Sequence, residues 1–310
     1  MIEARNLTKR YGKLVALDDL SLDIGTGEVF GFIGPNGAGK STTMKILACL
    51  MRADSGSATI DGHDVATDGP TIRRLIGYMP DFLGVYEDLT VDEYLQFFAA
   101  AFRIPRKQRR ATIDGVLELT DLTDKRRSPV DGLSRGMTQR LGVARVLIHD
   151  PKVLLLDEPA SGLDPRARIE MRTLLAELGR MGKSIMISSH ILTELAELCS
   201  TIGIIEKGKL LFSGSLDDAY RKASLGDRVR ITIEGGLDIE KAEQVLEGDP
   251  RITRVSSNGR TITVDLTPDT QSRHFIIEKL SAAGALIGAF RPEEARLEDA
   301  FLRLTKGSVQ

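Results

Sequence analysis

An eight-residue segment near the start of the chain has the composition of a loop that binds phosphate groups. Gly34–Ser41 reads GPNGAGKS and matches the pattern G-x-x-x-x-G-K-[ST]. Its glycines allow backbone angles that direct successive N–H groups toward one point, and a helix N-terminus adds partial positive charge there. Lys40 can reach the β- and γ-phosphates of a nucleotide, while the Ser41 hydroxyl can ligate Mg²⁺. The segment therefore predicts a nucleoside triphosphate site.

Two consecutive acids follow an apolar run later in the chain. Val153–Leu156 precedes Asp157 and Glu158. Asp157 is expected to hold Mg²⁺ through water, since this ion prefers octahedral oxygen ligands and keeps several waters. Glu158 is placed to polarise an attacking water as general base. Two acids alone would also suit a solvated strand end, but the phosphate loop upstream favours nucleotide hydrolysis.

Strands buried on both faces are expected to position these groups. Val29–Ile33 is a continuous apolar run directly before the phosphate loop, and a helix is expected over Lys40–Leu50. Val153–Leu156 and Ser184–Ile187 are similar runs with a helical pattern between them. Buried strands that alternate with helices predict an α/β fold with a parallel sheet.

Two other patterns occur in the first 220 residues. Ile2–Leu7 and Leu20–Ile24 alternate apolar and polar residues, as half-buried strands do, and Asp61-Gly62 is a hairpin signal. The stretch from Val91 to about Arg145 is mostly helical in pattern. We therefore expect a second, partly exposed sheet and a helical subdomain.

The pattern changes near Ser215. A short helix is followed by an order of elements that reads βαββαβ plus one helix, which predicts a small ferredoxin-like domain. The expected elements are a strand over Arg228–Ile233, a helix over Ile239–Leu246, a turn at Asn258-Gly259, a strand over Thr261–Leu266, a helix over Gln271–Ala283, a strand over Leu286–Phe290 and a helix over Leu297–Leu304.

Composition limits the classes of function. The 310 residues suggest one large domain and one smaller one, and the net charge of −2 argues against a dedicated nucleic-acid binder. No apolar run approaches the ~20 residues of a membrane span, and the first residues lack a signal-peptide pattern. Cys49 and Cys199 are expected to be buried, reduced thiols.

Four further motifs complete a resemblance. Leu133–Met137 (LSRGM) looks like a signature motif, and Ser161–Asp164 (SGLD) looks like a D-loop. His190 looks like a switch histidine, and Tyr11 looks like the aromatic residue that stacks on adenine. With the two earlier motifs, residues 1–220 resemble the nucleotide-binding domain of the ABC ATPase family.

The resemblance implies a fold class and an assembly. The fold is α/β, with a mixed sheet core, an antiparallel β subdomain and a helical signature subdomain over residues 1–220, followed by the small α+β ferredoxin-like domain over 221–310. Two nucleotide-binding domains face each other head to tail around two ATP molecules, as a homodimer or as paired ATPase domains. An integral membrane permease would be the partner, which places the chain as a peripheral protein on the cytoplasmic face of the cell membrane.

The resemblance also assigns roles to single residues. Glu158 and His190 are expected to be catalytic, and Ser134 and Gly136 of one subunit would contact the γ-phosphate held by Lys40 of the other. The metal ligands would be Ser41, Asp157 and Asp81. The residues expected to contact ATP within one chain are Tyr11, Gly34, Pro35, Asn36, Gly37, Ala38, Gly39, Lys40, Ser41 and Thr42.

Two positions depart from the family pattern. Asp81 stands where the Q-loop usually has glutamine, and Asp has no N–H donor, so hydrogen bonding near the phosphates changes. Arg135 stands where the signature commonly has glycine. It could favour phosphate or the opposing subunit, or simply point to solvent.

The leading interpretation is an ATPase that powers export through a separate permease. The alternatives are an importer ATPase or a non-transport ABC ATPase that acts on ribosomes or DNA. The segment Tyr86–Phe102 carries aromatic residues that either fill the helical core or receive the permease. The C-terminal domain resembles the tail of bacterial drug- and antibiotic-export ATPases, which suggests dimerisation or regulation, or a passive appendage.

Overall fold

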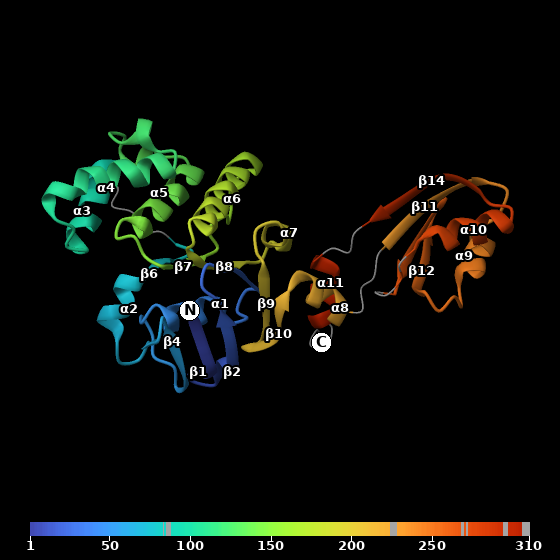
Figure 1. Ribbon diagram of the computed structural model, residues 1–310, viewed down its shortest axis with the longest axis horizontal. Coiled ribbons are helices and arrows are strands. Elements are labelled where there is room, and N and C mark those ends of the chain that lie inside the picture. The colour runs from blue at the N-terminus through green and yellow to red at the C-terminus, as the bar shows by residue number, and fades with distance from the viewer. Residues whose placement is uncertain are drawn as a thin grey trace. The chain divides into compact units, whose positions relative to one another are not determined.

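The chain forms two compact units, residues 1–214 and 215–310 (Figure 1). The computed structural model describes residues 1–82, 84, 88–223, 228–267, 270, 272–293 and 297–305. The boundary expected at residue 220 would cut a short helix, α8 (Leu216–Lys222), whereas the contacts keep this helix whole within the second unit.

A six-stranded sheet forms the centre of the first unit. Its strand order is β10-β9-β3-β8-β7-β6, and β9, β3, β8, β7 and β6 pair in parallel. The strands are β3 (Val29–Ile33), β6 (Ile76–Met79), β7 (Val153–Asp157), β8 (Ser184–Ser189), β9 (Thr201–Glu206) and β10 (Lys209–Ser215). Every residue of β7 and β8 is buried, which confirms the expected doubly covered parallel sheet.

A second sheet of the first unit is antiparallel, with the order β2-β1-β4-β5. Its strands are β1 (Ile2–Tyr11), β2 (Leu14–Ile24), β4 (Ser55–Ile60) and β5 (His63–Asp64). The turn at Asp61-Gly62 joins β4 to β5, as the sequence predicts. One face of this sheet joins the core under the phosphate loop, where Leu7 and Leu17 are buried together with Met44 and Leu47 of the helix α1 (Lys40–Leu47).

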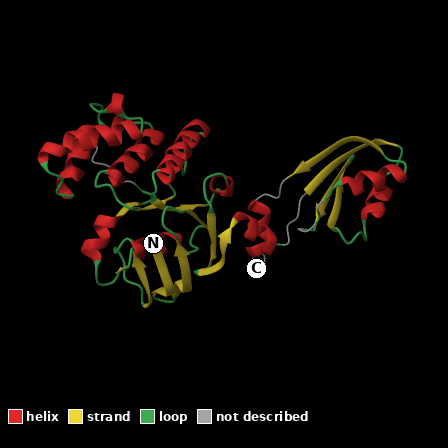
Figure 2. Ribbon diagram, viewed as in Figure 1, coloured by secondary structure: helices red, strands yellow, loops and turns green. Residues whose placement is uncertain are grey.

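Helices surround the two sheets (Figure 2). They are α1, α2 (Gly69–Leu75), α3 (Val91–Ala101), α4 (Arg106–Leu119), α5 (Arg135–Leu147), α6 (Pro165–Arg180) and α7 (Leu192–Ala196), with 3-10 turns at Thr123–Lys125 and Val130–Gly132. α1 ends three residues before the expected Leu50 because Cys49 adopts a positive φ of 56°, which a continuing right-handed helix does not allow.

The helical subdomain contains α3, α4 and α5. A capping box at Thr90 and Glu93 starts α3, and Tyr94 of this helix is fully buried. His149, just after α5, stacks on Phe102 with ring centroids 3.8 Å apart, and its Nε2 lies 2.9 Å from the Ile76 carbonyl oxygen. The helical subdomain is thereby fixed to the start of β6.

The second unit contains the predicted small domain. Its sheet is antiparallel with the order β12-β13-β11-β14, the strand order of a ferredoxin-like fold, and α9 and α10 cover one face (Figure 2). The elements are β11 (Arg228–Gly235), α9 (Ile239–Leu246), β12 (Ile252–Asn258), β13 (Thr261–Leu266), α10 (His274–Ala282), β14 (Leu286–Glu293) and α11 (Leu297–Thr305). Gln271, the expected first residue of α10, lies outside the described residues. The terminal helix α11 packs against α8.

The structure departs in part from the expected pair of buried thiols. Cys199 is buried and Cys49 half-buried, and both are free thiols. Burial raises the pKa of the Cys199 thiol to about 12. Within the described ranges, no helix is long and apolar enough to cross a membrane.

A buried carboxylate organises one end of the second unit. Asp249 accepts hydrogen bonds of 2.9 Å from Nε and Nη2 of Arg251, and Lys279 of α10 lies 2.7 Å from its Oδ2. The Arg251 guanidinium also lies 3.6 Å from the ring centroid of Phe275. Hydrogen bonds from Arg251 and Lys279 hold the pKa of Asp249 well below its usual value of 3.8. This carboxylate therefore ties the loop after α9 to α10 while it is ionised.

We predict that Asp249→Asn destabilises the second unit by about 1–3 kcal/mol at pH 7, since two cations lose their anionic partner. A lowered pKa in the folded state gives stability that is present above pH 3.8 and is lost progressively as the pH falls toward the folded value. The difference in the free energy of unfolding between Asp249→Asn and the parent should therefore decrease as the pH falls. Amide hydrogen exchange in β13 and α10 would measure it, with exposed Glu247→Gln as the control. Equal exchange in Asp249→Asn and the parent at pH 7 would show that the cluster is not stabilising.

Candidate nucleotide-binding site

The phosphate loop lies between β3 and α1, as expected, and two of its glycines have no room for a side chain. A Cβ at Gly39, whose φ is 113°, would lie 2.6 Å from the Ala16 carbonyl oxygen. A Cβ at Gly34 would overlap the carbonyl oxygen of Ile205 on β9. The loop is thus pressed against β2 and β9 in a shape that only glycine permits at these positions.

Lys40 is a buried cation held by the loop itself. Its side chain is 6% exposed, and its Nζ donates a 2.6 Å hydrogen bond to the carbonyl oxygen of Gly34. The same Nζ lies 3.5 Å from Oε1 of Glu158. Buried charge is tolerated when it is paired and hydrogen-bonded. The ammonium group therefore connects the phosphate loop to the acid that follows β7.

The register of the central sheet brings a serine to Asp157. In the parallel pair of β7 and β8, Asp157 lies opposite Ser188. Ser188 Oγ donates a 2.5 Å hydrogen bond to Asp157 Oδ1 and accepts one of 3.0 Å from the Glu158 backbone N–H. The serine thereby fixes both acids. Our sequence reasoning gave it no role, although a serine at the end of the neighbouring buried strand is the signal that would have suggested one.

Glu158 lies between two basic groups. Its Oε2 is 2.7 Å from Nδ1 of His190, and its Oε1 has no hydrogen-bond partner and faces Lys40. The Glu158 backbone adopts a positive φ of 53°, an uncommon conformation that occurs at functional sites. His190 comes just after β8 and is about half exposed, so its ring can meet a ligand on one side and Glu158 on the other. The structure therefore brings together Lys40, Asp157, Glu158 and His190, all expected from the sequence.

Tyr78 is a second residue that our sequence reasoning did not single out. It lies on β6 beside β7, and its buried hydroxyl has no hydrogen-bond partner. Burial, followed by the charges of Asp157 and Asp81, raises the pKa of Tyr78 to about 12. Both carboxylates are therefore close enough to act on this hydroxyl, and Asp81 itself is exposed just beyond β6. An unpartnered buried donor beside two carboxylates suits bound water.

Other expected site residues lie at the surface of the chain. Tyr11 is 45% exposed on β1, and its hydroxyl donates to Sδ of Met51 at 2.9 Å. Ser134 caps α5 by accepting a 3.3 Å hydrogen bond from the Met137 backbone N–H. Among the described residues, no hydrogen bond or ion pair joins Ser134 or Gly136 to Lys40 or Glu158 of the same chain. The remaining expected ATP contacts are exposed Pro35, Asn36 and Gly37, buried Ala38, and half-buried Ser41 and Thr42.

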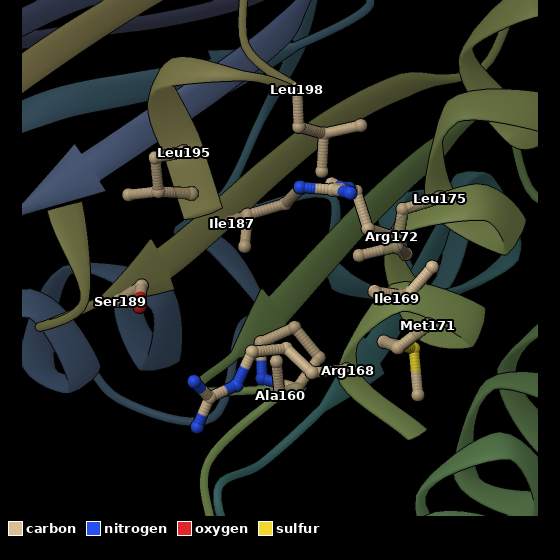
Figure 3. A pocket seen from close by; sticks show the side chains of 11 residues that line it. Ala160, Arg168, Ile169, Met171, Arg172, Leu175, Ile187, Ser189, Leu195 and Leu198 are labelled. Atoms are coloured by element: carbon tan, nitrogen blue, oxygen red, sulfur yellow. The ribbon is translucent and has the colours of Figure 1, made fainter. Parts of the chain in front are cut away.

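A separate cavity of about 70 Å³ lies between α6, β8 and α7 (Figure 3). Its walls are mainly apolar, with Leu175, Ile187 and Leu195 among them, and Arg168 lies beside Ala160 at one end. Lys40, Asp157, Glu158 and His190 do not line it. The cavity is therefore not the place where phosphate would bind.

Comparison with known proteins gives the family. Residues 17–161 match the ABC transporter family. The chain is 36% identical over its full length to the Nod factor export ATP-binding protein I of Burkholderia orbicola (strain AU 1054), covering 98% of that protein. It is 31% identical to the linearmycin resistance ATP-binding protein LnrL of Bacillus subtilis (strain 168), over 76% of each chain.

Solved structures give the same result. An ATP-binding subunit of an ABC transporter superposes with a TM-score of 0.65 at 31% identity, covering 72% of this chain and 92% of that one. The dimeric structure of a bacterial ABC transporter cassette superposes with a TM-score of 0.64 at 27% identity, covering 70% of this chain and 99% of that one. The motifs and the matches agree, and this chain belongs to the ABC transporter family as an ATP-binding subunit.

Proposed function

We propose that the chain hydrolyses ATP to power export through a separate membrane permease, on whose cytoplasmic side it is held as a peripheral subunit. The observation that carries the hydrolytic part is the position of Glu158, between Lys40 and His190 at the end of β7. A carboxylate held there can accept a proton from water, beside a loop shaped for phosphate. ATP hydrolysis coupled to transport is the reaction of this family.

The residues around Asp157 fit a magnesium ion. Asp157, Asp81 and the Ser41 hydroxyl offer the oxygen ligands that Mg²⁺ prefers, and the Tyr78 hydroxyl offers a donor with no partner. When bound, Mg²⁺ would neutralise charge on the phosphate oxygens. Ser188 would orient Asp157 toward it, because the serine hydroxyl occupies only Oδ1 of that carboxylate.

ATP binding would change the partners of Lys40. Phosphate oxygens would replace the Gly34 carbonyl and Glu158 as partners of the ammonium group. Charge-assisted hydrogen bonds to phosphate are stronger than a hydrogen bond to a neutral carbonyl. Glu158 would then keep only its contact with His190 and could take a proton from a water aligned with the γ-phosphate. The exposed side of the His190 ring would donate to that phosphate. In this sequence of events, Glu158 becomes available as a base only after the phosphate groups of the nucleotide have bound Lys40.

A second copy would complete each site. Ser134 and Gly136 lie at the exposed start of α5, where backbone N–H groups and the Ser134 hydroxyl can bind an anion. In the head-to-tail dimer that the family resemblance implies, the γ-phosphate they bind would be held by Lys40 of another copy. The similar bacterial cassette was solved as a dimer, which supports this arrangement.

The names of relatives support the direction of transport. The Nod factor export protein matches this chain along its full length, second unit included, and LnrL is named for linearmycin resistance. Exposed aromatic rings at Phe82 and Phe97 of the first unit would meet the permease, while Tyr86 lies outside the described residues. For the second unit, we propose a role in dimerisation or regulation of the exporter.

We predict that Glu158→Gln binds ATP but hydrolyses it about 10²–10³-fold more slowly, because the amide cannot accept the proton of the attacking water. The variant should form a stable dimer with ATP. Steady-state phosphate release and analytical ultracentrifugation would measure the two effects, with exposed Glu118→Gln on α4 as the control. Near-normal turnover in Glu158→Gln would remove Glu158 as the base.

We predict that Ser188→Ala lowers the affinity for Mg²⁺ in ATP hydrolysis by about 10–100-fold, because Asp157 loses the donor that orients it. A Mg²⁺ titration of phosphate release at saturating ATP would show the change. Ser189→Ala is the matched control, since among the described residues that hydroxyl bonds to the backbone of Ile191 and not to Asp157 or Glu158. If both serine variants need the same Mg²⁺ concentration as the parent, Ser188 does not position the metal ligand.

We also predict that tagged Glu158→Gln, expressed in its native cell and purified from gently solubilised membranes, carries a stoichiometric multi-span membrane protein with it. Lys40→Ala, which should bind ATP poorly, serves as the nucleotide-dependence control. Assay of transport with the recovered partner would separate export from import. Recovery of ribosomes or DNA without a membrane protein would contradict the transporter assignment and leave the ATPase assignment standing.

A further inference from the structure

Arg135, the first residue of α5, lies against a glycine of the D-loop segment, Ser161–Asp164. A Cβ built on Gly162 would overlap the Arg135 guanidinium, with Nη1 only 2.6 Å away. The guanidinium group therefore occupies the space that any other residue at 162 would fill with its own side chain. The end of this arginine side chain therefore lies against Gly162, although the residue as a whole is exposed.

The backbones of the two segments also meet nearby. A Cβ on Gly136 would lie 2.8 Å from the Cβ of Ala167, in the first turn of α6. Asp164 starts α6 by accepting 3.0 Å hydrogen bonds from the backbone N–H groups of Arg166 and Ala167. The D-loop segment thus lies beside the starts of two helices, α5 and α6.

The D-loop segment is joined to the catalytic strand at its other end. The Ser161 backbone N–H donates a 3.0 Å hydrogen bond to the carbonyl oxygen of Glu158. Arg168 Nη2 donates a 3.3 Å bond to the Leu163 carbonyl oxygen, and Figure 3 shows the Arg168 side chain beside Ala160. A continuous series of contacts therefore runs from Arg135 through the D-loop segment to Glu158.

Arg135 contributes packing to this series and keeps its hydrogen-bonding capacity. In the described part of the chain it forms no hydrogen bond or ion pair, and it is exposed, as are Ser134 and Gly162. Planar guanidinium groups pack flat on small surfaces in a way that an ammonium group does not. Glycine at 135, common in the family pattern, would leave Gly162 uncovered.

We propose that Arg135 is a positioning residue that clamps the D-loop segment to the start of α5, so that both meet a second copy as one preformed surface. The inference rests on the proposed ATP-bound dimer. An uncovered loop with glycine at its second position would have to be ordered when the dimer forms, at a cost in conformational entropy. The clamp removes part of that cost before association, and it links the surface that takes the second copy's nucleotide to the chain's own Glu158.

The test is a double-mutant cycle of Arg135→Ala and Gly162→Ala in the Glu158→Gln background. We expect Arg135→Ala to raise the ATP concentration at half-maximal dimerisation by about 3- to 30-fold. Its affinity for ADP, measured by calorimetry on the monomer, should not change, because Lys40 and its loop are untouched. Arg166→Ala is the matched control, an exposed arginine in the first turn of α6.

Gly162→Ala gives the second arm of the cycle. With Arg135 present, its Cβ displaces the guanidinium and strains a φ of +67°. In the Arg135→Ala background only the backbone strain remains. Gly162→Ala should therefore weaken dimerisation less there than it does when Arg135 is present. Dimerisation of Arg135→Ala at the parent's ATP concentration, or an equal cost of Gly162→Ala in both backgrounds, would overturn the clamp alone. Failure of the Glu158→Gln parent to dimerise with ATP would instead overturn the proposed dimer, and the clamp with it.

Discussion

The first unit is organised around one buried ion pair, between Lys40 of the phosphate loop and Glu158 after β7. A buried ammonium group is costly unless a carboxylate and hydrogen-bond acceptors surround it. This requirement links β3 and β7, which have β8 between them, because Glu158 directly follows β7 and Lys40 begins α1 at the end of the loop after β3. Gly34 and Gly39 meet the same constraint, since the loop must press close to β2 and β9 for the Lys40 side chain to reach inward.

β8 and the residue that follows it supply further polar partners for the two acids after β7. Its register places Ser188 opposite Asp157, and His190 follows two residues later, close to Glu158. One strand therefore orients the proposed metal ligand and partners the proposed base. The Glu158 carboxylate lies close to both Lys40 and His190. A ligand that draws Lys40 toward phosphate therefore changes the surroundings of the base directly. The coupling of nucleotide binding to hydrolysis then needs no large movement within one chain.

The sequence predicted elements and motifs well, and contacts across strands poorly. Lys40, Asp157 and Glu158 could be placed because their motifs are contiguous and follow buried strands. For Ser188 the sequence offered only the signal of a serine at the end of a buried strand, and for Tyr78 it offered none, since their contacts depend on the register of β8 and β6 against β7. The early end of α1 at Cys49 was likewise missed, because a positive φ at cysteine leaves no compositional signal. The ferredoxin-like order of the second unit was predictable, since every element there has its own clean periodicity.

At Asp81, where the chain departs from the family pattern, a neighbouring residue can supply the hydrogen-bond donor that the aspartate lacks. A glutamine at this position would offer both an acceptor and an N–H donor, whereas an ionised aspartate only accepts. Tyr78, three residues earlier, provides a buried hydroxyl within electrostatic range of Asp81 and Asp157. Since burial raises its pKa to about 12, this hydroxyl keeps its proton at physiological pH and stays a donor. The donor that Asp81 lacks is therefore available from the strand that leads to it, and the two carboxylates can share one set of waters around a cation.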